Sequence, residues 1–134
     1  MSWSDAYLGI PFCDLGRDPA GCDCWGLIHL VYARELKIDL PSYRHAYNST
    51  DERAEIEGLI GTAAASSTWH RQDEPQAMDV VLFRRGQVTS HIGIVVRPNW
   101  MLHMADAGAR VECYGMPSWK QRLRGFYRHE RLMA

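Results

Sequence analysis

Cys24 is the residue of this chain best suited to nucleophilic chemistry, and it lies in the stretch Gly21-Cys-Asp-Cys-Trp-Gly-Leu27. An apolar-periodic segment follows at once and runs to about Leu36, so the spacing predicts a helix that begins at Cys24. Unpaired N–H groups and the positive end of the helix dipole favour an anion there. Because the thiolate is the nucleophilic form of cysteine, this position predicts a reactive thiol. The alternative is that Cys24 is a small buried hydrophobe.

Two histidines on expected strands can supply the base that such a thiol needs. His91 opens one apolar run and His103 lies near the end of the next. If a hairpin around Pro98-Asn99 joins these strands, both residues lie about equally far from the turn, roughly 5–8 Å apart between Cβ atoms. Packing the predicted helix across this sheet brings Cys24 to the same edge. A nucleophile, a base and an orienting group therefore converge by geometry. The alternative for His91 is a structural histidine whose hydrogen bonds are satisfied within the fold.

The other histidines are weaker candidates. His29, His45 and His70 are expected to be surface or packing residues. His129 stands among charged residues near the end of the chain and is expected on a solvated face.

The elements around these residues are helical first and extended afterwards. A second helix is expected over roughly 51–60, and residues 66–75 are expected to form a connection. The order predicts an α+β domain with an antiparallel meander. Its five expected strands are 80–83, 91–96, 100–104, 109–114 and 124–128.

Composition fits one globular domain over residues 1–134, with 46% hydrophobic and 23% charged residues. The formal net charge of −1 gives no reason to expect nucleic-acid binding. No stretch predicts membrane insertion, and the polar start lacks the features of a signal peptide, so synthesis in a cytoplasm is expected. Free thiols and no cofactor are expected, with a Cys13–Cys22 disulfide, or a metal clip of N-terminal cysteines and a histidine, as the alternatives. The cysteines are Cys13, Cys22, Cys24 and Cys113.

Five segments, in order, resemble the NlpC-family cell-wall cysteine peptidases, which have a papain-like fold. The resemblance implies that the nucleophile helix packs on the five-stranded sheet. It also implies that Cys24 attacks the scissile carbonyl, that His91 exchanges the proton, and that His103 holds the His91 imidazole. The matching segments are 8–12, 21–27, 77–83, 90–95 and 102–104.

The resemblance implies substrate-binding roles for Asp23, Trp25, Phe12 and Ser90. In relatives the acid before the cysteine contacts a free amino group of the substrate, and Asp23 is also expected to cap the helix. The chain departs from the family pattern at Trp25, where Ser is usual, and at Phe12, where Tyr is common. Met78 stands where a glycine is usual. These departures leave the specificity for γ-D-glutamyl–diamino-acid bonds open.

Two motifs are most similar to those of the short members of this family encoded by tailed bacteriophages and gene-transfer particles. They are Cys24-Trp-Gly-Leu27 and Gly125-Phe-Tyr-Arg128. This resemblance implies an endopeptidase that cuts stem peptides of peptidoglycan while DNA is delivered. The protein would be made in a bacterial cytoplasm, carried in the virion tail and active in the host wall or periplasm. Its partners would be stem peptides and tail-tip or hub proteins. The alternative is a structural or assembly component of the tail tip with little or no activity.

Overall fold

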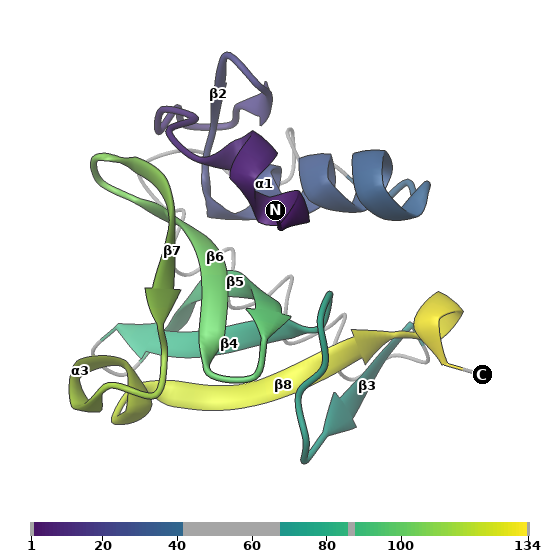
Figure 1. Cartoon of the computed structure of the whole chain (residues 1–134), viewed down its shortest axis with the longest axis vertical. Helices are drawn as coiled ribbons and strands as arrows, with labels where there is room; N and C mark the ends of the chain where they lie inside the picture. The colour runs from purple at the N-terminus through teal and green to yellow at the C-terminus, as the bar shows by residue number, and fades with distance from the viewer. Residues whose placement is uncertain (1, 42–67, 86–87, 134) are drawn as a thin grey trace.

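The computed structural model describes residues 2–41, 68–85 and 88–133, and it has the expected α+β class (Figure 1). A helical N-terminal part lies over a curved antiparallel sheet. Within these residues, no helix is long and apolar enough to cross a membrane. The elements are η1 (Trp3–Tyr7), β1 (Arg17–Asp18), β2 (Gly21–Cys22), α1 (Cys24–Val31), η2 (Tyr32–Leu36), β3 (Trp69–Gln72), β4 (Val80–Arg85), β5 (Val88–Arg97), β6 (Trp100–Ala105), β7 (Gly108–Cys113), α3 (Pro117–Lys120), β8 (Leu123–His129) and η4 (Glu130–Leu132).

The helix that was predicted to begin at Cys24 has the predicted limits. α1 begins at Cys24, and the π-helical segment η2 continues it to Leu36. Asp23 is its N-cap, as expected, and its side chain accepts a hydrogen bond from the Gly26 backbone. Lys37 ends the helical path in a left-handed conformation, with φ of 57°. The second predicted helix, at 51–60, lies outside the described residues.

Among the described residues the main sheet has six strands, in the order β3-β8-β4-β5-β6-β7, so the prediction of five was one strand short. The first four predicted strands, β4 to β7, form a meander as expected. The fifth, β8, does not continue the meander beside β7 but returns to pair with β4. Residues 69–72 were predicted as part of a connection. They form β3 because they pair with β8, with Trp69 opposite His129.

Two apolar clusters cover opposite faces of the sheet. On one face α1 buries Leu27 and Ile28 in the same cluster as Ile92 and Leu102. The other cluster contains Phe83 and Met101, and Trp119 packs against it. Because side chains alternate along a strand, His91 and His103 lie on this second face, together with Phe83 and Met101.

The predicted solvated position of His129 is wrong. Its side chain is 5% exposed and makes an edge contact with the Trp69 ring, the centroids being 5.0 Å apart. The imidazole accepts a hydrogen bond from the Arg131 backbone at 3.1 Å and so caps η4. Burial lowers the pKa of His129. The histidine is therefore part of the contact between β3, β8 and Tyr32 of η2.

The start of β4 is fixed by a buried ion pair. Asp79 is fully buried, and both of its carboxylate oxygens accept hydrogen bonds from Arg128 of β8, at 2.8 and 2.9 Å. Met78, just before it, has φ of 76°, a left-handed conformation that favours glycine. The Tyr32 hydroxyl donates a hydrogen bond to the Met78 carbonyl. The backbone at Met78 therefore has a conformation that suits glycine, the residue that is usual at this position in the family pattern.

Candidate active site

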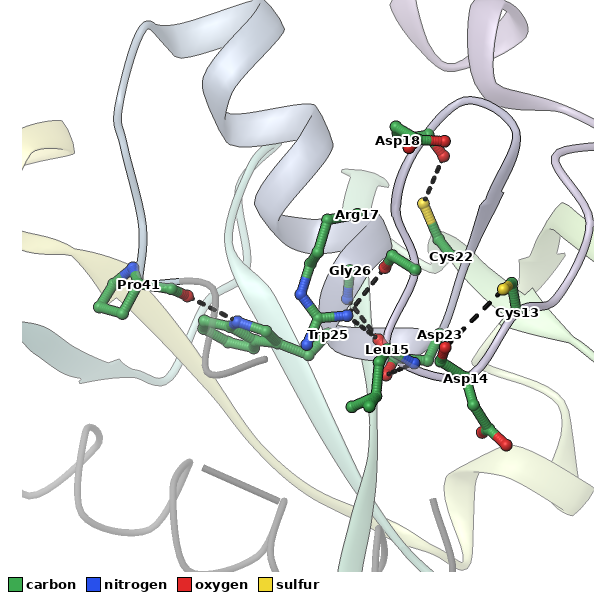
Figure 2. A network of polar contacts seen from close by, with 11 residues as sticks. Cys13, Asp14, Leu15, Arg17, Asp18, Cys22, Asp23, Trp25, Gly26 and Pro41 are labelled. Atoms are coloured by element: carbon green, nitrogen blue, oxygen red, sulfur yellow. Dashed lines mark hydrogen bonds and ion pairs between the residues drawn. The ribbon is translucent and has the colours of Figure 1, made fainter. Parts of the chain in front are cut away.

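A network of polar contacts holds the N-terminus of α1 against the preceding loop (Figure 2). One carboxylate oxygen of Asp23 accepts hydrogen bonds from the Gly26 backbone and from Arg17 Nη1, both at 2.7 Å. The other oxygen accepts from the Leu15 backbone at 3.1 Å. Because Asp23 immediately precedes Cys24, these contacts set the position of the thiol relative to the loop.

The Arg17–Asp23 pair is buried, with side chains 7% and 0% exposed. The capping role of Asp23 is confirmed, and its contact with a substrate amine stays a prediction. Gly26, the glycine that follows Cys24-Trp25, is also required by the structure. A Cβ on Gly26 would lie 1.9 Å from the Gly16 carbonyl oxygen, so only glycine allows the loop to approach the helix this closely.

The remaining residues of the predicted site have different surroundings. Cys24 is 7% exposed at the start of α1. Trp25 is buried in the main core, where its indole N–H donates to the Pro41 carbonyl at 2.8 Å. Phe12 is 46% exposed. Ser90 lies in β5, directly before His91. The substrate-binding roles of Trp25, Phe12 and Ser90 stay predictions.

The two histidines meet, as the hairpin predicts. His91 Nε2 and His103 Nδ1 are 2.9 Å apart, and both side chains are almost fully buried. The cause is the register of β5 and β6, which pairs Gly93 with His103 and makes His91 its diagonal neighbour. Gly93 leaves the space that the pair needs, because a Cβ there would lie 3.4 Å from His103 Cβ and 2.9 Å from Met101 Sδ.

Two further residues surround this pair, and neither was predicted to lie beside the histidines. Glu112 of β7 contacts His103 Nε2 through its carboxylate. Trp119 of α3 stacks on His91, with ring centroids 5.5 Å apart and planes 25° apart, and it meets His103 edge-on at 5.0 Å. Side chains alternate between the two faces of a strand. Counting along β7 from the turn between residues 105 and 108 would therefore have placed Glu112 on the same face as His103. No local pattern indicates Trp119.

The cysteines of the described residues are free thiols. Cys22 is fully buried, and its thiol donates to the Asp18 carbonyl at 3.2 Å. Burial, together with the nearby Asp23 carboxylate, raises the pKa of Cys22 to about 11, so it stays protonated at neutral pH. In residues 2–41, 68–85 and 88–133 no group of three or more His, Cys, Asp or Glu side chains is arranged to hold a metal ion.

The structure fixes the orientation of the His91 imidazole relative to that of His103. α1 packs against β5 and β6, the two strands that hold His91 and His103. The imidazoles lie on the face of these strands away from α1. The pairing of Cys24 with His91 stays a prediction.

Comparisons with known proteins identify the fold and the family pattern. Residues 9–128 match the sequence profile of the NlpC/P60 family. Similar solved structures include an NLP/P60 lipoprotein-like protein of Staphylococcus aureus (TM-score 0.67, 24% identity, 94% of this chain and 38% of that one). They also include the NlpC/p60 domain of the peptidoglycan hydrolase SagA (TM-score 0.59, 19% identity, 92% and 90%). At these identities the likeness concerns the fold.

Curated relatives are longer than this chain. The murein DD-endopeptidase MepS/murein LD-carboxypeptidase of Escherichia coli K12 is 27% identical over 108 residues, which are 80% of this chain and 49% of the relative. The probable endopeptidase p60 of Listeria seeligeri is 29% identical over 122 residues, 91% of this chain and 20% of the relative. The chain thus spans about half the length of the first of these relatives and a fifth of the second.

Proposed function

Because the chain belongs to the NlpC/P60 family, we propose that it is a cysteine peptidase that hydrolyses an amide bond in the stem peptides of peptidoglycan. The similar proteins named above are a murein DD-endopeptidase, a probable endopeptidase and a peptidoglycan hydrolase. The observation that carries the proposal is the contact of His91 with His103 at 2.9 Å, on strands against which α1 packs. Cys24 is the first residue of that helix.

The proposed reaction has two halves. His91 takes the proton of the Cys24 thiol, and the thiolate attacks the scissile carbonyl carbon. The backbone N–H of Cys24 in the first turn of α1 is the candidate donor to the oxyanion. The C–N bond then breaks as His91 gives a proton to the leaving amine, which leaves an acyl-enzyme. A water molecule gives a proton to His91 and attacks the thioester, so the acid is released and the thiol is restored. His103 orients His91 throughout.

We further propose that the protein is part of the tail of a phage-like particle and acts on the host wall during DNA delivery. The support is the resemblance of the Cys24–Leu27 and Gly125–Arg128 segments to the short phage versions. Mass spectrometry of purified particles should find the protein together with tail-tip or hub proteins. Its absence from intact particles that are otherwise complete would contradict this location.

An assembly role without catalysis is the second candidate. Exposed apolar side chains at Leu8, Phe12 and Trp100 favour it, because contact surfaces commonly contain such groups. Activity decides between the candidates: a wild-type protein that releases no fragment from any muropeptide, yet is incorporated into particles, would favour assembly.

The test of hydrolysis is digestion of purified muropeptides, followed by mass spectrometry of the products. The wild type should release new fragments whose masses identify the bond. Cys24→Ala should release none while its circular dichroism spectrum stays unchanged. Cys13→Ala is the matched control, because Cys13 is an exposed thiol in the preceding loop. It should keep full activity. Equal cleavage by Cys24→Ala and wild type would refute the assignment of the nucleophile.

A further inference from the structure

Glu112 contacts the histidine pair on the side away from His91. Its carboxylate oxygen Oε2 hydrogen-bonds to His103 Nε2, while His103 Nδ1 faces His91 Nε2 at 2.9 Å. The three side chains therefore form a chain of two hydrogen bonds in series, from β7 through β6 to β5. Neither family resemblance nor sequence spacing assigned a role to this glutamate.

The sheet itself brings Glu112 to this position. The register of β6 and β7 pairs His103 with Arg110 and Met101 with Glu112. Glu112 is thus a diagonal neighbour of His103 on the same face, a spacing that a glutamate side chain can bridge. Its side chain is 25% exposed, whereas that of His103 is 3% exposed. The carboxylate therefore lies between a buried imidazole and solvent.

The direction of each hydrogen bond follows from the chemistry of the groups. An ionised carboxylate only accepts, so His103 must donate from Nε2. In neutral His103 the Nδ1 atom is then an acceptor, and His91 must donate to it from Nε2. In neutral His91 the remaining ring atom, Nδ1, carries the lone pair. One carboxylate thereby determines the tautomers of two imidazoles.

We propose that Glu112 is a positioning residue that acts through His103 and makes His91 Nδ1 the atom that exchanges a proton with the thiol. The inference rests on the proposed function, since it names the part that this carboxylate has in the same site. When His91 takes up the proton of Cys24, it keeps its donation to His103. The carboxylate at the end of the chain then stabilises the positive charge of the imidazolium.

The groups around this chain determine how the effect depends on pH. From β7, Arg110 Nη2 lies 3.4 Å from the other Glu112 oxygen, Oε1, and partly offsets its charge. From α3, the Trp119 ring packs on both imidazoles and excludes water from them. The guanidinium of Arg122 lies over the Trp119 ring at 4.2 Å. Removing the negative charge of Glu112 withdraws stabilisation from the imidazolium. Removing the positive charge of Arg110 has the opposite effect.

The first experiment measures tautomers without any substrate, so its result does not depend on the proposed function. Nitrogen-15 NMR of the histidine rings in the full chain should give Nε2–H forms for both His91 and His103 above pH 8. In Glu112→Gln the two forms of His103 should mix, because an amide both donates and accepts. A wild-type His103 in the Nδ1–H form would overturn the proposal. So would unchanged spectra in Glu112→Gln.

The second experiment measures the pH dependence of kcat and kcat/KM with the muropeptide substrate. In Glu112→Gln, kcat should fall roughly tenfold or more at unchanged KM. An orienting carboxylate in direct contact with the catalytic histidine is worth about 10⁴ in the serine-protease triad, and Glu112 acts one imidazole further away. The pH above which the rate falls, the alkaline limb of the pH–rate profile, should move to a lower value. Glu112→Asp should recover part of kcat, and Arg110→Gln should move the limb to higher pH.

Glu74→Gln is the matched control, because it removes an exposed carboxylate from the loop before β4. Its pH profile should equal that of the wild type. A uniform loss of activity in Glu112→Gln, with both limbs unmoved and no recovery by Glu112→Asp, would show a merely structural role and overturn the proposal. If the wild type cleaves nothing, the proposed function fails, and the NMR experiment still decides the role of Glu112.

Discussion

Replacing Asp23 by alanine should destabilise the domain severely, because one carboxylate serves as helix cap and counterion together. Loss of the cap on Gly26 costs about 1 kcal/mol. Arg17, only 7% exposed, would lose the carboxylate that lies 2.7 Å away, and breaking a buried pair in this way costs about 3–5 kcal/mol. The two effects overlap, so we expect a total of about 3–5 kcal/mol. That is a large part of the 5–15 kcal/mol typical of a domain.

Urea unfolding followed by circular dichroism measures this cost. Asp23→Asn keeps an acceptor for the cap and loses the charge, so it should be less destabilised than Asp23→Ala. The double variant Arg17→Met/Asp23→Ala should lose at least about 1 kcal/mol less than the sum of the two single variants, because no unpaired charge remains. Asp39→Ala, whose carboxylate is 98% exposed, is the control and should change stability by about 0.5 kcal/mol or less.

Two results would refute this reasoning. One is a cost below about 1 kcal/mol for Asp23→Ala, and the other is strict additivity in the double variant. If Asp23→Ala does not fold, Asp23→Asn and Arg17→Met are compared instead to measure the cost of breaking the buried pair. Each of these variants leaves one partner of the pair in place.

Three further predictions concern the scaffold. Lys37→Gly should raise stability in urea by about 1 kcal/mol, because φ of 57° strains a lysine and suits glycine; an unchanged or lower midpoint would contradict this. Burial lowers the pKa of His129, so the unfolded state alone takes up a proton below about pH 6.5, and the free energy of unfolding should fall there by at most about 1.4 kcal/mol per pH unit. His129→Asn keeps the cap acceptor and should flatten this decline; equal slopes would be inconsistent with it. Arg128→Met should cost about 3–5 kcal/mol in urea, with part regained in Asp79→Asn/Arg128→Met, since Asp79 is fully buried.

Local signals explain what the sequence could predict. The helix start at Cys24 follows from Asp23 as its cap and the periodic apolar residues after it. The contact of His91 with His103 follows from a short hairpin turn, because the turn fixes the register of the two strands. These features depend on residues close together in the chain.

The features that the sequence missed depend on distant partners. β3 is an edge strand whose only buried residue is Trp69, and the strand that it pairs with begins 51 residues after its end. The burial of His129 is set by strand alternation, which its charged neighbours obscured. Trp119 reaches the histidines from a helix of four residues, whose place no periodic pattern predicts. Tertiary contacts therefore determine the surroundings of the candidate base.

The most direct test of the proposed site is the pH dependence of alkylation at each cysteine, measured by peptide mass spectrometry with iodoacetamide. We predict that Cys24 reacts already at neutral pH, where an ordinary thiol is mostly protonated, and that His91→Gln abolishes this reactivity. Cys22 is the internal standard, because burial raises its pKa to about 11 and it should stay unlabelled. Labelling of Cys24 that rises only above about pH 8, and does so equally in His91→Gln, would contradict a thiolate activated by that histidine.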